Sequence, residues 1–178
     1  MKRYILLFIF IMPFVLQAQS PDKLIENGKY DEAIEKCVDR LSKDKGNTTA
    51  LYSSLKRAYE TANALDLEKI KTLKMSGGPD IWYDVFTGYY SIQQRYVLVS
   101  GIKEMLEADM VNIKLLEYPE DLEVSRKNAG AFLYATAMKN MKAGTREGAM
   151  EAYSDLIKIT RLFEEYKDVE LRMRQALG

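Results

Sequence analysis

The chain has 178 residues, of which 47% are hydrophobic and 29% charged, which is enough for one globular domain. Its 26 basic and 26 acidic side chains balance, so it lacks the basic excess typical of nucleic-acid-binding proteins. It contains no histidine and one cysteine. This sequence therefore excludes histidine-based catalytic triads and an intramolecular disulfide, and we expect no cofactor and no metal.

Residues 1–18 predict a cleavable secretory signal peptide. The basic start MKR precedes the apolar run YILLFIFIMPFVL, which is shorter than the ~20 residues of a membrane-spanning helix. Cleavage after Ala18 fits best, because cleavage after Ser20 would leave Pro21 directly behind the cut bond. No cysteine directly follows the run, so there is no lipid-attachment motif. We expect a periplasmic or secreted protein that starts at Gln19 and has no integral membrane span after cleavage; an uncleaved N-terminal anchor is the alternative.

Residues 19–178 predict one all-α domain, because helical periodicity dominates and no Gly/Ser-rich linker divides them. Residues 30–43 form the first amphipathic helix, with one stripe of apolar positions: Tyr30, Ala33, Ile34, Cys37, Val38 and Leu41. We expect Cys37 to be a buried small side chain; a reactive or intermolecular thiol is the alternative. The sequence Lys45-Gly46-Asn47 predicts a stop and turn.

Two further helices are predicted before the clearest break in the chain. Residues 48–64 place five residues on one face, namely Leu51, Leu55, Ala58, Tyr59 and Ala62. A separate helix through LDLEKIKTLKM follows. The sequence SGGPD at 76–80 cannot continue a helix, and Asp80 is a candidate cap for the next one.

The helix at about 81–99 carries more aromatic residues than any other predicted helix. One side is predicted to hold Trp82, Val85, Phe86, Tyr89, Tyr96 and Val97. Tyr83 and Tyr90 fall on a separate flank, seven residues apart. This flank either packs against another helix or forms a binding stripe for a peptide, a glycan or a subunit. Tyr83 and Tyr90 are thus the candidate binding residues.

The rest of the chain is predicted to form helices, with one short extended segment between them. Residues 101–109 look helical, and VNIKLLEYP alternates apolar and polar residues with period two. Pro119 opens a long helix to about Met141, whose expected apolar positions are Val124, Ala131, Leu133 or Phe132, Tyr134, Ala137 and Met138. Gly144 ends it, and helices at 146–161 and 167–177 follow.

Two segments of the chain, called phrases below, have similar sequences: GKYDEAIEKCVDRL at 28–41 and GTREGAMEAYSDLI at 144–157. Their alignment pairs Gly28 with Gly144 and Ala33 with Ala149. A glycine with positive φ ends one helix, and a small residue soon after it allows two helices to approach closely. We therefore expect Ala33 and Ala149 to be close-packed.

These phrases resemble the tetratricopeptide repeat, above all in exported proteins of Gram-negative bacteria. The first copy matches the turn glycine, aromatic and small residue of that family at Gly28, Tyr30 and Ala33. The proline near the end of the family repeat is missing in both copies, and their 116-residue separation is no multiple of the ~34-residue period. The resemblance implies antiparallel helical hairpins with a degenerate middle.

No motif for chemistry emerges from the sequence. There is no G-x-x-x-x-G-K-[ST] or G-x-G-x-x-G phosphate-binding motif. The paired carboxylates Glu120/Asp121 and Glu164/Glu165 lie at helix starts or turns, where solvated charge is ordinary. The resemblance implies a non-enzymatic protein-interaction module with no catalytic residues and with a protein partner. Glycan or polymer binding through exposed aromatics is the alternative, followed by an enzyme that uses carboxylates alone; no nucleic-acid partner is expected.

The signal-peptide prediction is tested by intact-mass measurement of the protein secreted to the periplasm of a Gram-negative host. We expect a mature chain that begins at Gln19, because Ala18 precedes the favoured cleavage site. A mass that retains Met1–Ala18 would show that the segment stays attached.

Overall fold

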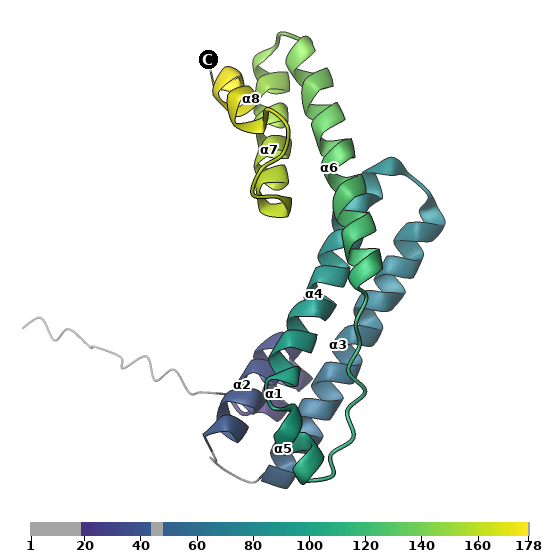
Figure 1. Cartoon of the computed structure of the whole chain (residues 1–178), viewed down its shortest axis with the longest axis vertical. Helices are drawn as coiled ribbons and strands as arrows, with labels where there is room; N and C mark the ends of the chain where they lie inside the picture. The colour runs from purple at the N-terminus through teal and green to yellow at the C-terminus, as the bar shows by residue number, and fades with distance from the viewer. Residues whose placement is uncertain (1–18, 44–47, 178) are drawn as a thin grey trace, which may run out of the picture.

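The computed structural model of the chain describes residues 19–43 and 48–177, and every regular element in them is a helix (Figure 1). The elements are, in chain order, α1 (Pro21–Glu26), α2 (Tyr30–Ser42), α3 (Thr48–Ser76), the 3₁₀ helix η1 (Pro79–Ile81), α4 (Trp82–Ser100), α5 (Lys103–Ala108), α6 (Pro119–Lys142), α7 (Arg146–Leu162) and α8 (Val169–Ala176). The all-α prediction is confirmed. The signal peptide and the turn at 45–47 lie outside the described residues.

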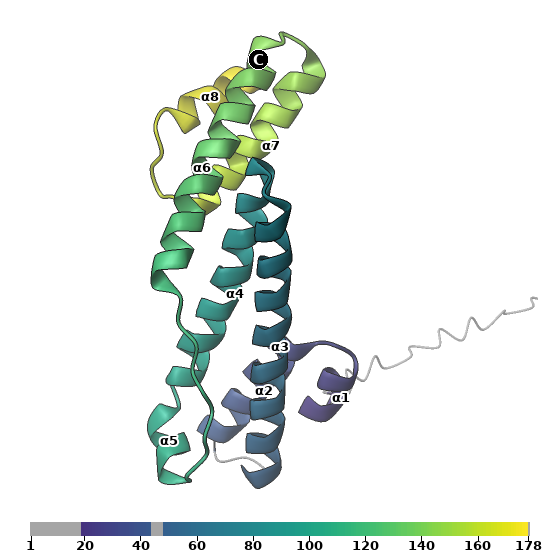
Figure 2. The ribbon, with the colours of Figure 1, turned by 90° about the vertical axis from the view of Figure 1, so that its right-hand side faces the viewer.

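The helices form an elongated bundle with three core clusters along its length (Figures 1 and 2). At one end, α1, α2 and α5 pack around α3 and the end of α4. In the middle, α3, η1 and α4 share a small cluster around Ile70, Val85 and Ile92. At the other end, α6, α7 and α8 form the third cluster. The α4 helix contributes to all three clusters, through Val99, Ile92 and Trp82 respectively.

The α2 helix buries the stripe that its sequence predicts. Ala33, Ile34 and Cys37 are all 0% exposed. Burial raises the pKa of the Cys37 thiol to about 11, so the thiol keeps its proton at neutral pH. The expected buried, small-hydrophobe role of Cys37 is confirmed.

The prediction of two helices between residues 48 and 75 is wrong, because α3 is one uninterrupted helix of 29 residues. No glycine or proline interrupts it. The apolar face changes along the helix because its two halves pack against different neighbours. Its first half buries Leu55 and Tyr59 against α2, and its second half buries Ile70 in the middle cluster. A helix of this length exceeds those of a regular 34-residue repeat of two helices.

The break at residues 76–80 is confirmed, but the predicted cap is not. Gly77 has φ +74° just after α3 ends. Asp80 lies inside η1, and the residue before α4 is Ile81, which makes no side-chain capping hydrogen bond. The 3₁₀ turn places Asp80 one position too early to cap α4.

Residues 111–118 have no regular secondary structure but keep the predicted alternation of burial. Ile113 is buried, whereas Asn112 and Lys114 are exposed. The segment runs along the bundle from α5 to α6 (Figure 2). Its backbone is tied to α3, since the Leu116 amide donates to the Tyr59 hydroxyl at 3.1 Å. It is therefore an extended strap without a strand partner in the part of the chain that the structure describes.

The predicted apolar face of α6 is partly wrong. Leu133 and Ala137 are buried, but Val124 is 52% exposed and Ala131 is exposed too. The buried face contains small and polar residues that a search for large apolar residues misses, namely Ser125, Ala129 and Gly130. Gly130 leaves room for the Phe163 ring, because a Cβ atom there would lie 2.6 Å from Phe163 Cε2.

The two similar phrases share a turn but not a packing register. Gly28 and Gly144 both have positive φ, +73° and +64°, as predicted. Ala33 is fully buried, whereas Ala149 is half-buried. In the second copy the closest approach falls on Gly148, where a Cβ atom would lie 2.5 Å from the Asn140 carbonyl oxygen. The expectation of a close-packed Ala149 is therefore wrong by one position.

This difference gives a matched set of stability variants. We expect Ala33→Leu and Gly148→Ala each to lower the free energy of unfolding by about 1–3 kcal/mol, because each added group enters a filled space. Ala149→Leu should change it by less than about 1 kcal/mol, because that side chain has access to solvent. Urea unfolding checks all three, and equal losses at positions 148 and 149 would contradict the register described here.

Candidate functional site

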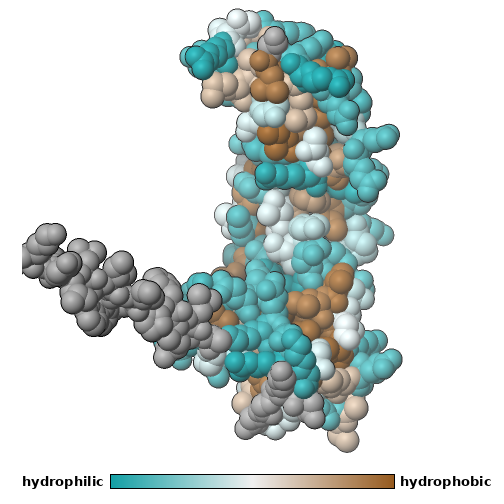
Figure 3. All heavy atoms as spheres, turned by 90° about the vertical axis from the view of Figure 1, so that its left-hand side faces the viewer, coloured by the Kyte–Doolittle hydropathy of each residue, from teal (hydrophilic) through white to brown (hydrophobic). Residues whose placement is uncertain are grey.

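The candidate site is the concave side of the bundle. Figure 1 shows α7 and α8 overhanging one end and α1 and α2 lying at the other end of the same side, with the middle of α4 between them. Figure 3 looks onto this side, where apolar residues gather in the upper and lower parts and paler residues lie between. Two depressions lie here, and both are lined by Tyr90 of α4.

Tyr90 is the most exposed aromatic feature of this side. Its side chain is 47% exposed, and its ring stacks on Phe86 one turn earlier with centroids 5.6 Å apart. The stacking restrains the ring while about half of the residue stays exposed. Such a rigid amphipathic ring is the type of residue that anchors protein interfaces.

The first depression is a groove between α2 and α4 of about 590 Å³, called the α2–α4 groove below. Its lining residues are Asp31, Ile34 and Glu35 from α2 and Tyr90, Ser91, Gln94, Arg95, Val97 and Leu98 from α4. Val97 is 55% exposed, which corrects the prediction that it lies on the core face of α4. The buried face runs instead through Val85, Gly88, Tyr89, Ile92, Arg95 and Val99.

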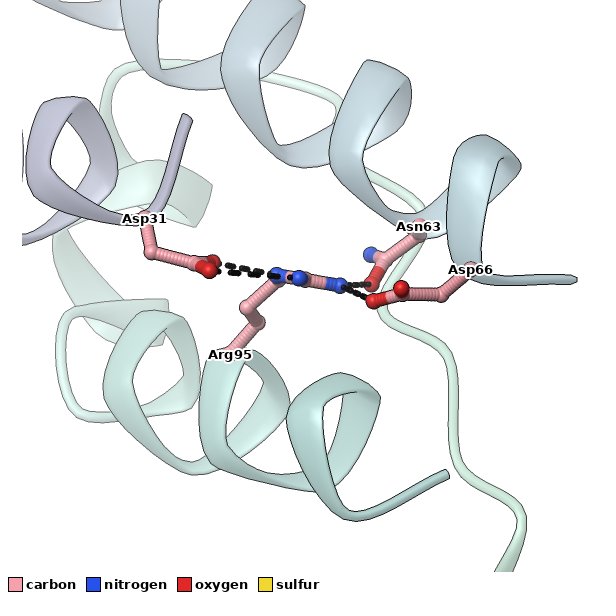
Figure 4. Close-up of polar contacts among 4 residues, drawn as sticks. All are labelled: Asp31, Asn63, Asp66 and Arg95. Carbon is pink, nitrogen blue, oxygen red and sulfur yellow. Dashed lines mark hydrogen bonds and ion pairs between the residues drawn. The ribbon is translucent and has the colours of Figure 1, made fainter. Parts of the chain in front are cut away.

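Arg95 lies at the base of this groove and joins three helices (Figure 4). Its Nε atom donates to Asp31 Oδ1 of α2 at 2.6 Å, and its Nη2 atom donates to Asp31 Oδ2 at 3.4 Å. Its Nη1 atom donates to Asp66 Oδ2 at 2.6 Å and to Asn63 Oδ1 at 3.1 Å, both on α3. The Arg95 side chain is only 8% exposed, so its position is fixed from both sides.

The electrostatics keep this guanidinium charged. Burial alone lowers the pKa of an arginine, but the hydrogen bonds and charges of Asp31 and Asp66 outweigh it and raise the pKa of Arg95. The two carboxylates differ in their surroundings, since the side chain of Asp31 is 64% exposed and that of Asp66 is 23% exposed. Asp31 therefore faces both Arg95 and the solvent of the groove.

The second depression, of about 420 Å³, lies between α4, the start of α6 and the end of α7. Tyr90 and Phe86 line it from α4, and Leu162 lines it from α7. Its charged lining residues are mixed: Glu117, Glu123, Arg126 and Arg161. Arg126 pairs with Glu123 and lies over the Phe163 ring, 5.2 Å from its centroid.

The structure separates the two candidate tyrosines. Residues seven positions apart lie on nearly the same helix face but about 10 Å apart along its axis. Tyr90 falls in the uncovered stretch of α4, whereas Tyr83 reaches the third core cluster, where it is half-buried. The Lys158 Nζ atom of α7 lies 5.8 Å from the centroid of the Tyr83 ring. Tyr90 is thus the more accessible of the two predicted binding residues.

Other polar clusters also connect helices. Tyr89 donates to Asp121 at 3.1 Å and accepts from Lys74 at 2.9 Å, which links α4 to α6 and α3. Burial raises the pKa of Tyr89, so its hydroxyl keeps its proton. Among the described residues no group of three or more metal-ligating side chains could hold a metal ion. None of the helices described here is long and apolar enough to cross a membrane.

Arg95 was missed by the sequence reasoning, although the sequence contains a signal for it. It is the only charged residue of α4 after Asp84, and the 88, 92, 95, 99 spacing places it on a helical stripe with Ile92 and Val99. A single charge on an apolar stripe is uncommon unless it is paired. Its partners could not be identified, because they lie 29 to 64 positions away.

Comparison with known proteins gives no relative, because no known family, curated protein or solved structure matches the chain.

The different surroundings of the tyrosines predict different effects on stability. Tyr90→Ala should lower the free energy of unfolding by no more than about 1 kcal/mol, because the exposed ring contributes little beyond its stacking on Phe86. Tyr83→Ala should lower it by about 2–3 kcal/mol, because it removes a ring from the third core cluster. Thermal and urea unfolding of both variants check this. A larger loss of unfolding free energy for Tyr90→Ala than for Tyr83→Ala would show that Tyr90 is a packing residue.

Proposed function

We propose that this chain is an exported, non-enzymatic, tetratricopeptide-like helical protein of the bacterial envelope that binds a protein partner on its concave side. The observation that carries the proposal is the uncovered stretch of α4, where Tyr90 and Val97 are exposed beside two depressions. Exposed apolar and aromatic side chains gathered in a concave surface are typical of interaction sites. The proposed export rests on the predicted signal peptide at 1–18.

The non-enzymatic character has support from the state of the reactive side chains. The Cys37 thiol is buried and its pKa is raised to about 11, so it is a poor nucleophile. The Tyr89 hydroxyl, which lies between Lys74 and Asp121, is likewise held in its neutral form by burial, which raises its pKa. The chain has no histidine to act as a base near neutral pH.

Glycan binding remains the alternative of a different class. A sugar ring stacks on an exposed aromatic face, and Tyr90 offers one. A platform of two tyrosines would hold a glycan better, but Tyr83 packs against the cluster of α6, α7 and α8. We favour a protein partner because the groove also exposes the apolar Val97, on the same helix as Tyr90, and an apolar side chain of a protein can cover it.

A site-specific crosslinking experiment tests the proposed function. A photo-reactive phenylalanine analogue is placed at Tyr90 in the full chain and, as a control of similar exposure, at Leu65 on α3, which is 55% exposed. The protein is produced with its own N-terminal segment and irradiated in envelope extracts of Gram-negative bacteria.

We expect one discrete protein adduct at position 90 that is absent at position 65. Excess unmodified protein should remove this adduct, whereas excess Val97→Asp should not. A crosslinked glycan in place of a protein would favour the alternative. Identical adducts at both positions, or none at position 90, would count against an interaction surface on α4.

A further inference from the structure

We infer that the α2–α4 groove binds a polypeptide segment that carries a lysine or arginine next to a bulky apolar residue. The inference rests on the proposed function and specifies the chemistry of the partner. It is carried by the exposed apolar residues of the α4 wall combined with unbalanced carboxylates on the α2 side.

The charge of the groove is negative once every contact is counted. Among the described residues that line the groove, Arg95 is the only basic one, and it already binds Asp31 and Asp66. Glu35 adds a third carboxylate to this neighbourhood and makes no ion pair or hydrogen bond among the described residues. The groove and its base therefore hold one guanidinium and three carboxylates, and the α4 wall adds no further charge. An incoming cation is attracted here, and an incoming carboxylate is repelled.

The two carboxylates of α2 are placed to share one cation. Asp31 and Glu35 are four positions apart, so they lie one turn apart on the same helix face, about 6 Å along the axis. Asp31 keeps much of its surface in solvent although it pairs with Arg95. A lysine ammonium or an arginine guanidinium above this turn would contact both side chains without displacing Arg95.

The opposite wall suits an apolar side chain. Val97 and Tyr90 are the exposed apolar residues there, and they flank Gln94 one turn from each. Half-buried Leu98 and fully buried Ile34 also line the groove. A bulky apolar side chain that covers Val97 removes apolar surface from water on both partners. The cation and the apolar group must therefore be neighbours in the bound segment.

The second depression shows that this preference is local. Its charged lining residues are two acidic and two basic side chains, and Arg126 is paired with Glu123. That surface has no excess of either sign. The preference for a basic residue is accordingly expected in the α2–α4 groove and not across the whole concave side.

A selection from displayed random twelve-residue peptides tests the inference on the full mature chain. Peptides are selected on the wild-type protein and then measured by fluorescence anisotropy against Glu35→Lys, Val97→Asp and Tyr90→Ala. The control is Glu68→Lys, which reverses a charge on an exposed position of α3 away from the groove.

We expect selected peptides to share a lysine or arginine beside a large apolar residue. Glu35→Lys should weaken their binding at least tenfold and make it less dependent on salt, whereas Glu68→Lys should change it less than twofold. The unfolding midpoint of Glu35→Lys should match that of the wild type, because Glu35 is exposed and unpaired within the described residues.

The outcomes separate the inference from the function on which it rests. Peptides without basic residues, or peptides that bind Glu35→Lys as tightly as the wild type but lose binding with Tyr90→Ala, would overturn the basic occupant and leave the interaction surface intact. Absence of any peptide sensitive to Tyr90→Ala, Val97→Asp or Glu35→Lys would overturn both.

Discussion

The position of the Arg95 guanidinium decides how three helices meet, and the concave side depends on that meeting. A buried cation must be paired, because its transfer out of water is costly. Arg95 satisfies this need only if Asp31 of α2 and Asp66 of α3 approach α4 from opposite sides. Apolar packing of α2 on α3 tolerates small shifts, whereas this fork of hydrogen bonds specifies one arrangement. The groove above it therefore has a defined width.

The length of α4 links this arrangement to the other end of the molecule. One end of α4 is held at the Arg95 network and the first core cluster, and its start at Trp82 contacts the cluster of α6, α7 and α8. The helix bridges two separately packed ends, and its middle packs on α3 and on the start of α6. Tyr90 lies in this middle part but stays exposed. The exposure of the candidate site is thus a consequence of how the cores are divided.

Local signals in the sequence were sufficient to locate most helix ends. They did not show that α3 is one continuous helix, and long-range packing decided which faces are buried. Gly28, Gly144 and Pro119 mark helix ends that backbone chemistry imposes, so they could be located in advance. The register of α7 could not, because whether Gly148 or Ala149 meets α6 depends on a carbonyl at Asn140. Similarly, the tyrosine pair was predicted from spacing, but the cover over Tyr83 comes from α7, which lies far along the chain. Arg95 was visible as an isolated charge, while its partners were not.

The double-mutant cycle of Arg95 and Asp66 measures this central constraint most directly. Arg95→Met keeps much of the side-chain volume but leaves the partly buried Asp66 without its cation, and it should lower the free energy of unfolding by about 2–4 kcal/mol. Asp66→Asn in the Arg95→Met background should then restore part of that loss, with a coupling of about 1–3 kcal/mol. Additive effects of the two substitutions in urea unfolding, or a harmless Arg95→Met, would show that the guanidinium does not determine how α2, α3 and α4 pack.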